Sequence, residues 1–417
     1  MNSTASACFS GAGNEGTVIP AGSIHDFNED AVPYSHSFEI DHVSPARKAM
    51  TSSYDSLGIR PIINAHATLT NLGGSLMPEE VRKAMEDSAG SFVDLHQLQR
   101  SVGERIAELT RNEAAYVSCG AASGLLLATA ACISRHTPDA YDDFPKFEKV
   151  PNEVIVQGMH RNSYDYAVRE AGATMMEIGS MEGTHMDDLE GAFSPATVAV
   201  FWFQGAMNRP SELSLDEVIR SARKRKVPVI VDAAAQLPPA SNLWNFTQKS
   251  ADLAIFSGGK DLAGPQASGL VLGSRDLIER IRGFGAPYHG VGRPMKVGKE
   301  ELMGLLAAVE RYLSLDHESQ QRTYEQRVQF WIRGLEGREG VRALRDFPNE
   351  AGQPVPRTLV ELPSEKPKEQ VIDALLHGEP RVAVAPSENG NALLLNPMTV
   401  KDGEPEIVLK QLLEVLE

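Results

Sequence analysis

The sequence predicts an α/β fold, in which a large domain with a mainly parallel sheet is followed by a small C-terminal α+β domain. The first observation is the length of 417 residues, which is enough for two domains. The second is the alternation of short apolar runs with stretches of helical spacing between about residues 113 and 273. The third is a change of pattern after about residue 300, where a long helical stretch precedes short strands and helices.

The apolar runs of the central region predict the strands of the larger sheet. They are short and rich in β-branched residues, and helix-like stretches such as Tyr164–Ala171 and Leu215–Arg225 lie between them. This pattern is typical of a parallel sheet that helices cover on both faces. The expected strands are Ala114–Val117, Val154–Val156, Val198–Phe203, Val227–Val231, Leu253–Phe256 and Gly269–Leu272.

The chain divides by composition into three parts. Residues 1–54 are rich in small and acidic residues without a sustained period, which predicts a flexible N-terminal extension. The large domain is expected over 55–300, with a first helix starting at Pro78. The range 301–417 is expected to hold a hinge helix and the small domain, with strands such as Thr358–Val360 and a last helix from Glu406.

Charge and composition exclude several classes of protein. The formal net charge of -16 disfavours nucleic-acid and membrane partners, and the basic run Arg223–Lys226 is interpreted as the solvated end of a helix. The cysteines Cys8, Cys119 and Cys132 have neither metal-ligand spacing nor the number for a disulfide framework, so no metal is expected. The sequence has no membrane-spanning run, and residues 1–46 carry no Lys or Arg, which favours a cytoplasmic protein.

Lys260 is the strongest candidate for a reactive group. It ends the motif Ser257-Gly258-Gly259-Lys260, which directly follows a predicted buried strand. A lysine in such a desolvated place gives up its proton more readily and can attack an aldehyde. The two glycines are expected to let the backbone approach something flat or anionic. The alternative is an ordinary lysine in a β-turn at the edge of the sheet.

Asp232 is the second candidate, at the end of the predicted strand Val227–Val231. Ligands of α/β sheets bind at the carboxyl ends of the strands, and a carboxylate there can pair with a protonated pyridine nitrogen. The alternative is a helix N-cap, which is a common role for aspartate after a strand. An aspartate at one strand tip and a lysine at the next are more informative together than either is alone.

A third element predicts an anion site. The run Tyr116–Gly124 reads as a strand, a loop of small residues and a helix start. Free amides at a helix N-terminus favour an anion, and small side chains let a phosphate approach closely. Ser257 is placed to add a hydroxyl to the same phosphate. The signal is weak when taken alone, because many α/β loops are rich in Gly and Ala.

Taken in order, these motifs resemble the selenocysteine synthase-like branch of the fold-type I enzymes that use pyridoxal 5'-phosphate (PLP). That branch is related to D-glucosaminate-6-phosphate ammonia-lyase and to the class V aminotransferases. The resemblance covers roughly residues 58–315. It rests on Asp232–Gly269, on Asn64-Ala65 with Thr70–Gly73, on Val102–Thr110 and on Gly292–Val297. It implies the aspartate-aminotransferase fold of PLP-dependent transferases.

The resemblance also implies roles for individual residues. Lys260 would be the Schiff-base lysine and Asp232 the partner of the pyridine nitrogen. His160, which follows a predicted strand, would stack on the ring; the alternative is an ordinary loop histidine. The phosphate cup would be formed by small and hydroxylated residues, namely Gly120, Ala121, Ala122, Ser123 and Ser257.

Further assignments concern the ring hydroxyl and the substrate. Gln236 is a candidate for the ring hydroxyl, although it lies four residues after Asp232 and the class V glutamine lies three after its aspartate. In the tail, Met398 stands where some relatives have an arginine, so the substrate carboxylate is expected to meet Arg293 or Arg209. Arg293 would reach the site of a partner subunit, because enzymes of this branch usually place the site at the interface of a homodimer.

The cofactor limits the chemistry without selecting one reaction. A lysine released from the cofactor can remove the Cα proton, after which elimination, transamination and racemisation are all open. The acidic chain makes a tRNA substrate improbable, so the expected reaction is α,β-elimination from a small hydroxy or phosphorylated amino acid, of the ammonia-lyase type. The alternatives are an aminotransferase or a racemase.

Two other classes remain open at this point. A nicotinamide-dependent dehydrogenase would also be an α/β protein, but no predicted strand is followed by the spacing Gly-x-Gly-x-x-Gly. A non-catalytic protein that keeps the fold is the other, and the intact pair of Asp232 and Lys260 disfavours it.

Overall fold

The computed structural model describes residues 54–135, 137, 141, 150–180, 182–205 and 210–417. One compact unit spans Leu57–Glu417. The predicted N-terminal extension lies almost entirely outside the described residues. Among the described helices, none combines the length and the apolar character that crossing a membrane requires.

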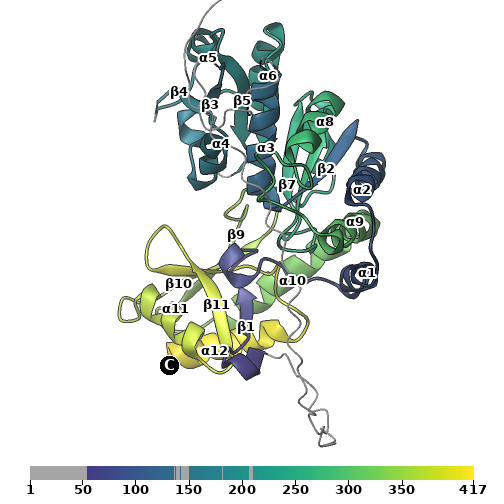
Figure 1. The fold of residues 1–417 in the computed structure, drawn as a ribbon. Helices are drawn as coiled ribbons and strands as arrows, with labels where there is room; N and C mark the ends of the chain where they lie inside the picture. Colours follow the sequence, from purple (N-terminus) through teal and green to yellow (C-terminus); the bar gives the residue numbers. More distant parts are fainter. Residues whose placement is uncertain (1–53, 136, 138–140, 142–149, 181, 206–209) are drawn as a thin grey trace, which may run out of the picture. The chain divides into compact units, whose positions relative to one another are not determined.

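Over the described residues, the larger sheet has seven strands, and its order places the strand tips that matter for function next to one another (Figure 1). All neighbours pair in parallel except β8, which runs antiparallel to both β2 and β7. The strands in spatial order are β2 (Ala114–Ser118), β8 (Gly269–Gly273), β7 (Leu253–Ser257), β6 (Val229–Asp232), β5 (Thr197–Phe203), β3 (Glu153–Gln157) and β4 (Thr174–Ile178).

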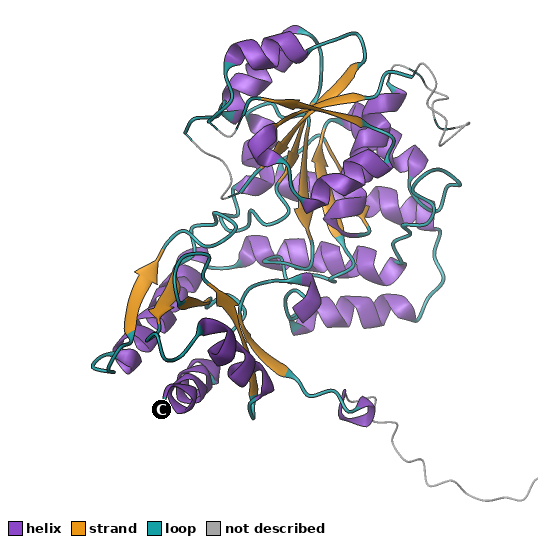
Figure 2. Ribbon diagram, turned by 90° about the vertical axis from the view of Figure 1, so that its left-hand side faces the viewer, coloured by secondary structure: helices purple, strands orange, loops and turns teal. Residues whose placement is uncertain are grey.

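Helices cover both faces of this sheet, and each face has its own apolar core (Figure 2). Alternation along β6 shows the division, because Val229 and Val231 belong to one core and Ile230 belongs to the other. The first core includes side chains of α2 (Leu95–Thr110), α6 (Leu215–Lys224), α7 (Asn242–Gln248) and α9 (Lys299–Ser314). The second includes side chains of α3 (Gly120–Ser134), α4 (Tyr166–Glu170) and α8 (Arg275–Phe284).

The smaller sheet is mostly antiparallel and is formed by both ends of the described chain. Its order is β1 (Ile62–Ala65), β11 (Arg381–Pro386), β12 (Ala392–Leu395), β10 (Arg357–Glu361) and β9 (Arg342–Asp346). Trp331 and Leu335 of α10 (His317–Leu335) pack into its core with side chains of α11 (Lys368–His377) and α12 (Glu404–Leu416). The remaining described helices are η1 (Tyr54–Leu57), η2 (Thr70–Leu72), α1 (Glu79–Ala89), η3 (Gly158–His160), η4 (Ser163–Asp165) and α5 (Met186–Ala192).

The fold agrees with the predicted α/β class and corrects it in detail. The expected strand Gly269–Leu272 is present as β8, but it runs against the others. β4 was missed because its exposed, mixed sequence lacks an apolar run; it is an edge strand. β1 was expected in the large domain, yet it pairs in parallel with β11 and so belongs to the smaller sheet.

Candidate active site

Asp232 is the last residue of β6, between the ends of β5 and β7. Its side chain is 8% exposed, and Oδ1 accepts the backbone N–H of Ala234 at 2.9 Å. Burial raises the pKa of the carboxyl group, while the Ala234 amide and the charge of Lys260 lower it. Oδ2 has no hydrogen-bond partner among the described residues, so one carboxylate oxygen is available to a ligand.

Lys260 lies in the turn after β7, the strand next to β6. Its side chain is partly buried, and this burial lowers the pKa of the amine below its ordinary value. The charges of Asp232 and Glu350 act in the opposite direction, because they stabilise the ammonium form. A lysine in this environment is more often a free, nucleophilic amine than a surface lysine is.

Close packing explains why glycine occupies the two positions before Lys260, whereas the sequence suggested the close approach of a ligand. A Cβ on Gly258 would lie 2.1 Å from Oγ of Ser268, and one on Gly259 would lie 2.5 Å from Cα of Gln266. Gly258 and Gly259 are therefore required for close packing of the β7–β8 connection against itself. The expectation that they open room for a ligand is not supported at these two positions.

The loop between β2 and α3 leaves an open helix N-terminus at the same edge of the sheet. Gly120 has φ +76°, a conformation that favours glycine, and no atom lies within 4 Å of the position of its missing Cβ. Helix α3 begins here, so its first amides have no partner within the helix. Ala122 is exposed, while Ala121 is partly buried.

Two serines complete this region in different ways. Ser123 is buried and donates its hydroxyl to the carbonyls of Cys119 (2.8 Å) and Gly120 (3.0 Å), so the oxygen can only accept from a ligand. Ser257 ends β7 and pairs in register with Gly269. A Cβ added to Gly269 would lie 2.4 Å from the carbonyl carbon of Gly120, so these two backbones are in close contact. Ser257 is thus close to the start of α3, as the predicted phosphate cup requires.

His160 lies against the other face of the sheet. It is fully buried, and its ring packs edge-on against Trp202 with ring centres 4.6 Å apart. Trp202 pairs with Val231 and shares its apolar core, whereas Asp232 is the next residue and points to the opposite face. Nε2 of His160 is 3.3 Å from Glu212, and burial lowers the pKa of the imidazole to about 4. These contacts do not bring His160 together with Asp232 or Lys260.

The remaining predicted residues have three different outcomes. Gln236 is buried, and its Nε2 donates to the carbonyls of Gln204 (3.2 Å) and Ala351 (2.8 Å), so its donor group is already engaged. Arg293 is exposed in the connection between α8 and α9, and its side chain makes no hydrogen bond or ion pair with the described residues. Arg209 lies outside the described residues.

Two further titratable residues, Glu350 and His66, carried no signal in the sequence. Glu350 lies in the β9–β10 connection, and its charge raises the pKa values of both Lys260 and His66. His66 follows β1 and is half-buried; the net effect of burial is to lower the pKa of its imidazole. Only the adjacent Asn64-Ala65 motif pointed to this part of the chain.

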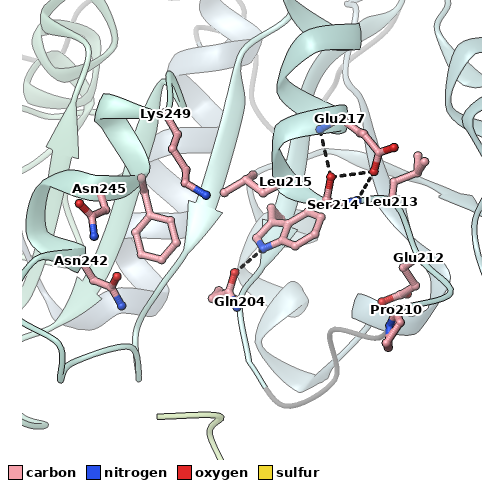
Figure 3. Close-up of a pocket in the computed structure, with 12 residues that line it drawn as sticks. Gln204, Pro210, Glu212, Leu213, Ser214, Leu215, Glu217, Asn242, Asn245 and Lys249 are labelled. Carbon is pink, nitrogen blue, oxygen red and sulfur yellow. Dashed lines mark hydrogen bonds between the residues drawn. The ribbon is translucent and has the colours of Figure 1, made fainter. Parts of the chain in front are cut away.

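A separate pocket of about 600 Å³ lies beside the β5 tip, and its described lining includes none of the predicted site residues (Figure 3). Trp202 donates Nε1–H to Oε1 of Gln204 at 2.8 Å on its wall, and the capping box of Ser214 and Glu217 lies on another side. The pocket adjoins the candidate site through Gln204, whose backbone carbonyl accepts a hydrogen bond from the Gln236 side chain.

The described residues fit PLP. An open helix N-terminus with small side chains suits a phosphate, a buried carboxylate with a free oxygen suits a protonated pyridine nitrogen, and a lysine of lowered pKa suits an aldehyde. All three lie at one edge of the same sheet, where β6 and β7 are neighbours and β8 separates β7 from β2. Within the described residues, no cluster of three or more His, Cys, Asp or Glu side chains is arranged to hold a metal ion.

Comparison with solved structures supports this reading of the fold. The structure of a D-glucosaminate-6-phosphate ammonia-lyase matches with a TM-score of 0.76 and 27% identity, and the match covers 88% of this chain and 99% of the other. An aspartate aminotransferase from Thermotoga maritima matches with a TM-score of 0.51 and 17% identity, over 87% and 92% of the two chains, which shows the fold alone. The protein is therefore a PLP-dependent enzyme with the aspartate-aminotransferase fold.

Relatives in sequence identify the family of the protein within this fold. A 5'-C-glycyluridine monooxygenase-decarboxylase from Streptomyces sp is 36% identical over 293 residues, which are 68% of this chain and 71% of that protein. The D-glucosaminate-6-phosphate ammonia lyase of Salmonella typhimurium is 28% identical over 87% of this chain and 98% of that protein. Residues 158–326 match the family SelA, L-seryl-tRNA selenium transferase. The chain belongs to the SelA family of PLP-dependent enzymes. The relatives support an enzyme of the elimination type, as the sequence predicted.

Proposed function

We propose that the protein catalyses α,β-elimination of a small α-amino acid with a hydroxyl group on Cβ. The support is a chemical feature shared by the compounds that the names of its relatives mention. A seryl group, D-glucosaminate-6-phosphate and 5'-C-glycyluridine all carry an amino group on Cα and a hydroxyl on the adjacent carbon. A hydroxyl at that position is the leaving group that an ammonia-lyase reaction requires.

In this proposal, Lys260 binds the cofactor covalently and acts as the base. PLP, when bound, supplies an electron-withdrawing ring that stabilises the charge left on Cα. The lowered pKa of Lys260 favours a neutral amine, which accepts the Cα proton once it is released from the cofactor. The Cβ–O bond then breaks with its electron pair on oxygen, and the hydroxyl takes up a proton and leaves as water. Hydrolysis of the resulting enamine gives ammonia and a keto acid.

Asp232 and the start of α3 are proposed to hold the two ends of the cofactor. The free oxygen of Asp232 would accept the pyridine N–H and thereby stabilise its positive charge. Burial keeps water away from this contact, which strengthens it. Gly120, Ala121 and Ala122 would bind the phosphate through backbone amides, and Ser123 and Ser257 would line the same cup.

Other proposed features concern the assembly and the domains. We propose a cytoplasmic homodimer in which Arg293, an exposed cation without an ion-pair partner among the described residues, reaches the substrate in the partner's site. Arg209, Gln236 and His160 remain candidates for substrate or cofactor contacts. The proposed division is an extension over 1–54, a large domain over 55–300 and a small domain over 301–417, to whose sheet β1 is added.

A second candidate is oxidative decarboxylation. The observation that favours it is the 36% identity with a monooxygenase-decarboxylase. Both reactions begin from an amino acid bound through its amino group, and they differ in whether the Cα proton or the carboxylate is lost and in the need for dioxygen.

The two candidates are distinguished by one assay with and without air. The purified, PLP-loaded enzyme is incubated with D-glucosaminate-6-phosphate, 5'-C-glycyluridine or L-serine. Elimination predicts equal amounts of ammonia and keto acid at the same rate under anaerobic conditions. Oxygen uptake together with carbon dioxide release would support the second candidate instead. Transfer of the amino group to an added keto acid would indicate an aminotransferase.

A further inference from the structure

We propose that Tyr312 is a positioning residue for Lys260 and acts on it through a hydrogen bond to the neighbouring Asp261. The proposal rests on the cofactor-binding role of Lys260 that is given above. Oη of Tyr312 donates to Oδ2 of Asp261 at 2.6 Å, and Asp261 directly follows Lys260 in the turn after β7. Tyr312 lies in α9 and is fully buried. This contact therefore joins the reactive turn to a helix of the large domain's core.

Helix α9 also packs against this turn through apolar side chains. Leu305, Ala308 and Tyr312 are three and four residues apart, so they share one face of the helix. A Cβ on Gly258 would lie 2.8 Å from Cδ1 of Leu305, and one on Gly264 would lie 3.1 Å from Cβ of Ala308. The helix thus meets both ends of the turn, and Tyr312 adds a polar contact between them.

The turn is held from another segment of the chain as well. Ser75 donates its backbone N–H and its hydroxyl to the carbonyl of Gly259, each at 3.0 Å. A Cβ on Gly74 would lie 2.4 Å from the same carbonyl oxygen, so the two backbones are in close contact. Both neighbours of Lys260 are therefore anchored, Gly259 by the segment before α1 and Asp261 by α9. Anchors on both sides restrict the backbone from which the lysine side chain extends.

Tyr312 is itself held by the start of α10. Nε2–H of His317 donates to the backbone carbonyl of Tyr312 at 2.9 Å, and the two rings meet edge-on with their centres 4.6 Å apart. Asp316 caps α10 by accepting the backbone N–H of Ser319 at 2.9 Å. Helix α10 then carries Trp331 into the core of the smaller sheet. Tyr312 therefore lies where the last helix of the large domain passes into the small domain.

The charge of Asp261 makes this hydrogen bond important. Burial raises the pKa of the Asp261 carboxyl group, while the Tyr312 hydroxyl lowers it because the hydrogen bond stabilises the carboxylate. Hydrogen bonds to ionised groups are stronger than those between neutral groups, and a carboxylate that loses its donor away from water is costly. Without this bond the turn is expected to shift, and a displacement of about 1 Å can slow a reaction by about 10²-fold. The Lys260 amine would then be misplaced relative to the aldehyde of the cofactor.

The test follows the covalent attachment of PLP to the full-length protein from which the cofactor has been removed. In this reaction the Lys260 nitrogen bonds to the aldehyde carbon, and the aldehyde oxygen leaves as water. Stopped-flow absorbance measures its rate at saturating PLP from the appearance of the visible band. Tyr312→Phe and Asp261→Ala should each slow it by about tenfold, because one hydrogen bond to a charged group is lost. Asp261→Asn keeps an oxygen that can accept the hydroxyl and should stay within about twofold of the wild type.

Further variants separate positioning from a general loss of stability. Tyr141→Phe is the matched control, because it removes another partly buried hydroxyl, which donates to a backbone carbonyl at 2.7 Å; the rate should not change. The double variant of Tyr312→Phe with Asp261→Ala should be no slower than the slower single variant, because both changes remove the same bond. Ser75→Ala should slow the reaction less, since the backbone N–H bond remains, and Ser75→Thr should restore the rate.

Lys260→Ala, measured in parallel, distinguishes the possible failures. A band that still forms in Lys260→Ala would overturn the role of the lysine and this proposal with it. A band that is lost there but forms at the wild-type rate in folded Tyr312→Phe would overturn the positioning role alone. Equal slowing in Asp261→Asn and Asp261→Ala would also overturn it, because charge and not the hydrogen bond would then be responsible. The two Asp261 variants decide the question if Tyr312→Phe does not fold, and none of these results depends on turnover.

Discussion

The central sheet and the β9–β10 connection that packs beside it are held in different ways. The tips of β6 and β7 belong to the central sheet, where each strand has a hydrogen-bonded neighbour on both sides. The loop that carries Glu350 comes from the smaller sheet and is held to the first region by side-chain amides of Gln236 and Gln353. The sheet therefore fixes the residues proposed to bind the cofactor, while the loop is held beside them by side-chain hydrogen bonds. Substitutions in the first region should remove activity, and those in the second should mainly lower stability.

The largest effect is expected at the lysine itself. Lys260→Ala removes the amine proposed to bind PLP and to act as the base, so turnover should fall by at least about 10³-fold. The visible absorbance band of the lysine-bound cofactor should also be lost. Lys249→Ala, which removes an exposed lysine in an ion pair with Asp216, is the control and should leave both unchanged. A Lys260→Ala enzyme with wild-type turnover would contradict the assignment.

Asp232→Asn should have the next largest effect. The asparagine keeps an oxygen that can accept the Ala234 amide but loses the negative charge. We expect kcat to fall by about 10²-fold, because the pyridine nitrogen loses the carboxylate that stabilises its proton. Steady-state kinetics at saturating PLP measure this change. A rise in KM alone, with kcat preserved, would place Asp232 outside the chemistry.

Gly258→Ala tests how tightly the tip of β7 is built. The added methyl group would lie 2.1 Å from Oγ of Ser268 and 2.8 Å from Leu305, so unfolding free energy should drop by about 1–3 kcal/mol. Gly283→Ala, which has nothing within 4 Å, is the matched control. Chemical denaturation of both variants gives the comparison. Equal stability of the two variants would mean that the turn can relax around the methyl group.

Gln353→Ala tests the loop in the same way. It removes the hydrogen bonds to Leu237 and Asn349, and Gln353 is only 4% exposed. A loss of about 1–2 kcal/mol in unfolding free energy is expected. Chemical denaturation measures this change. An unfolding free energy equal to that of the wild type would show that the loop does not depend on these contacts.

The smallest effect on activity is expected at His160, which packs against the other face of the sheet. Burial lowers its pKa from 6.5 in the unfolded chain to about 4 in the folded one, so the unfolded state binds the proton first. The neutral imidazole thus contributes stability above pH 6.5, and this contribution is lost as the pH falls toward about 4. His160→Gln should flatten that part of the stability profile and leave the cofactor spectrum unchanged. An altered spectrum would instead favour the predicted stacking on the ring.

The sequence predicted what depends on local pattern. Lys260 and Asp232 were found because each follows an apolar, β-branched strand, and adjacent parallel strands end at the same edge of a sheet. β4 and β9 were missed because edge strands with exposed faces have no continuous apolar run.

Long-range packing accounts for the other differences. β1 pairs with β11, a strand more than three hundred residues away, and no local sequence pattern predicts such a partner. The β9–β10 connection reaches Gln236 and Leu237 through Ala351 and Gln353, and only the folded chain brings these segments together. His160 follows β3 as the sequence predicted, its packing against Trp202 could not be read from local pattern, and its stacking on the ring stays a prediction.

The most direct test is to locate the cofactor on the chain. The PLP-loaded enzyme is reduced with borohydride, digested, and searched by mass spectrometry for the peptide that carries the pyridoxyl group. The account predicts the label on Lys260, with none on any other lysine and none in Lys260→Ala. A label on a different lysine, or no label after full loading with PLP, would contradict it.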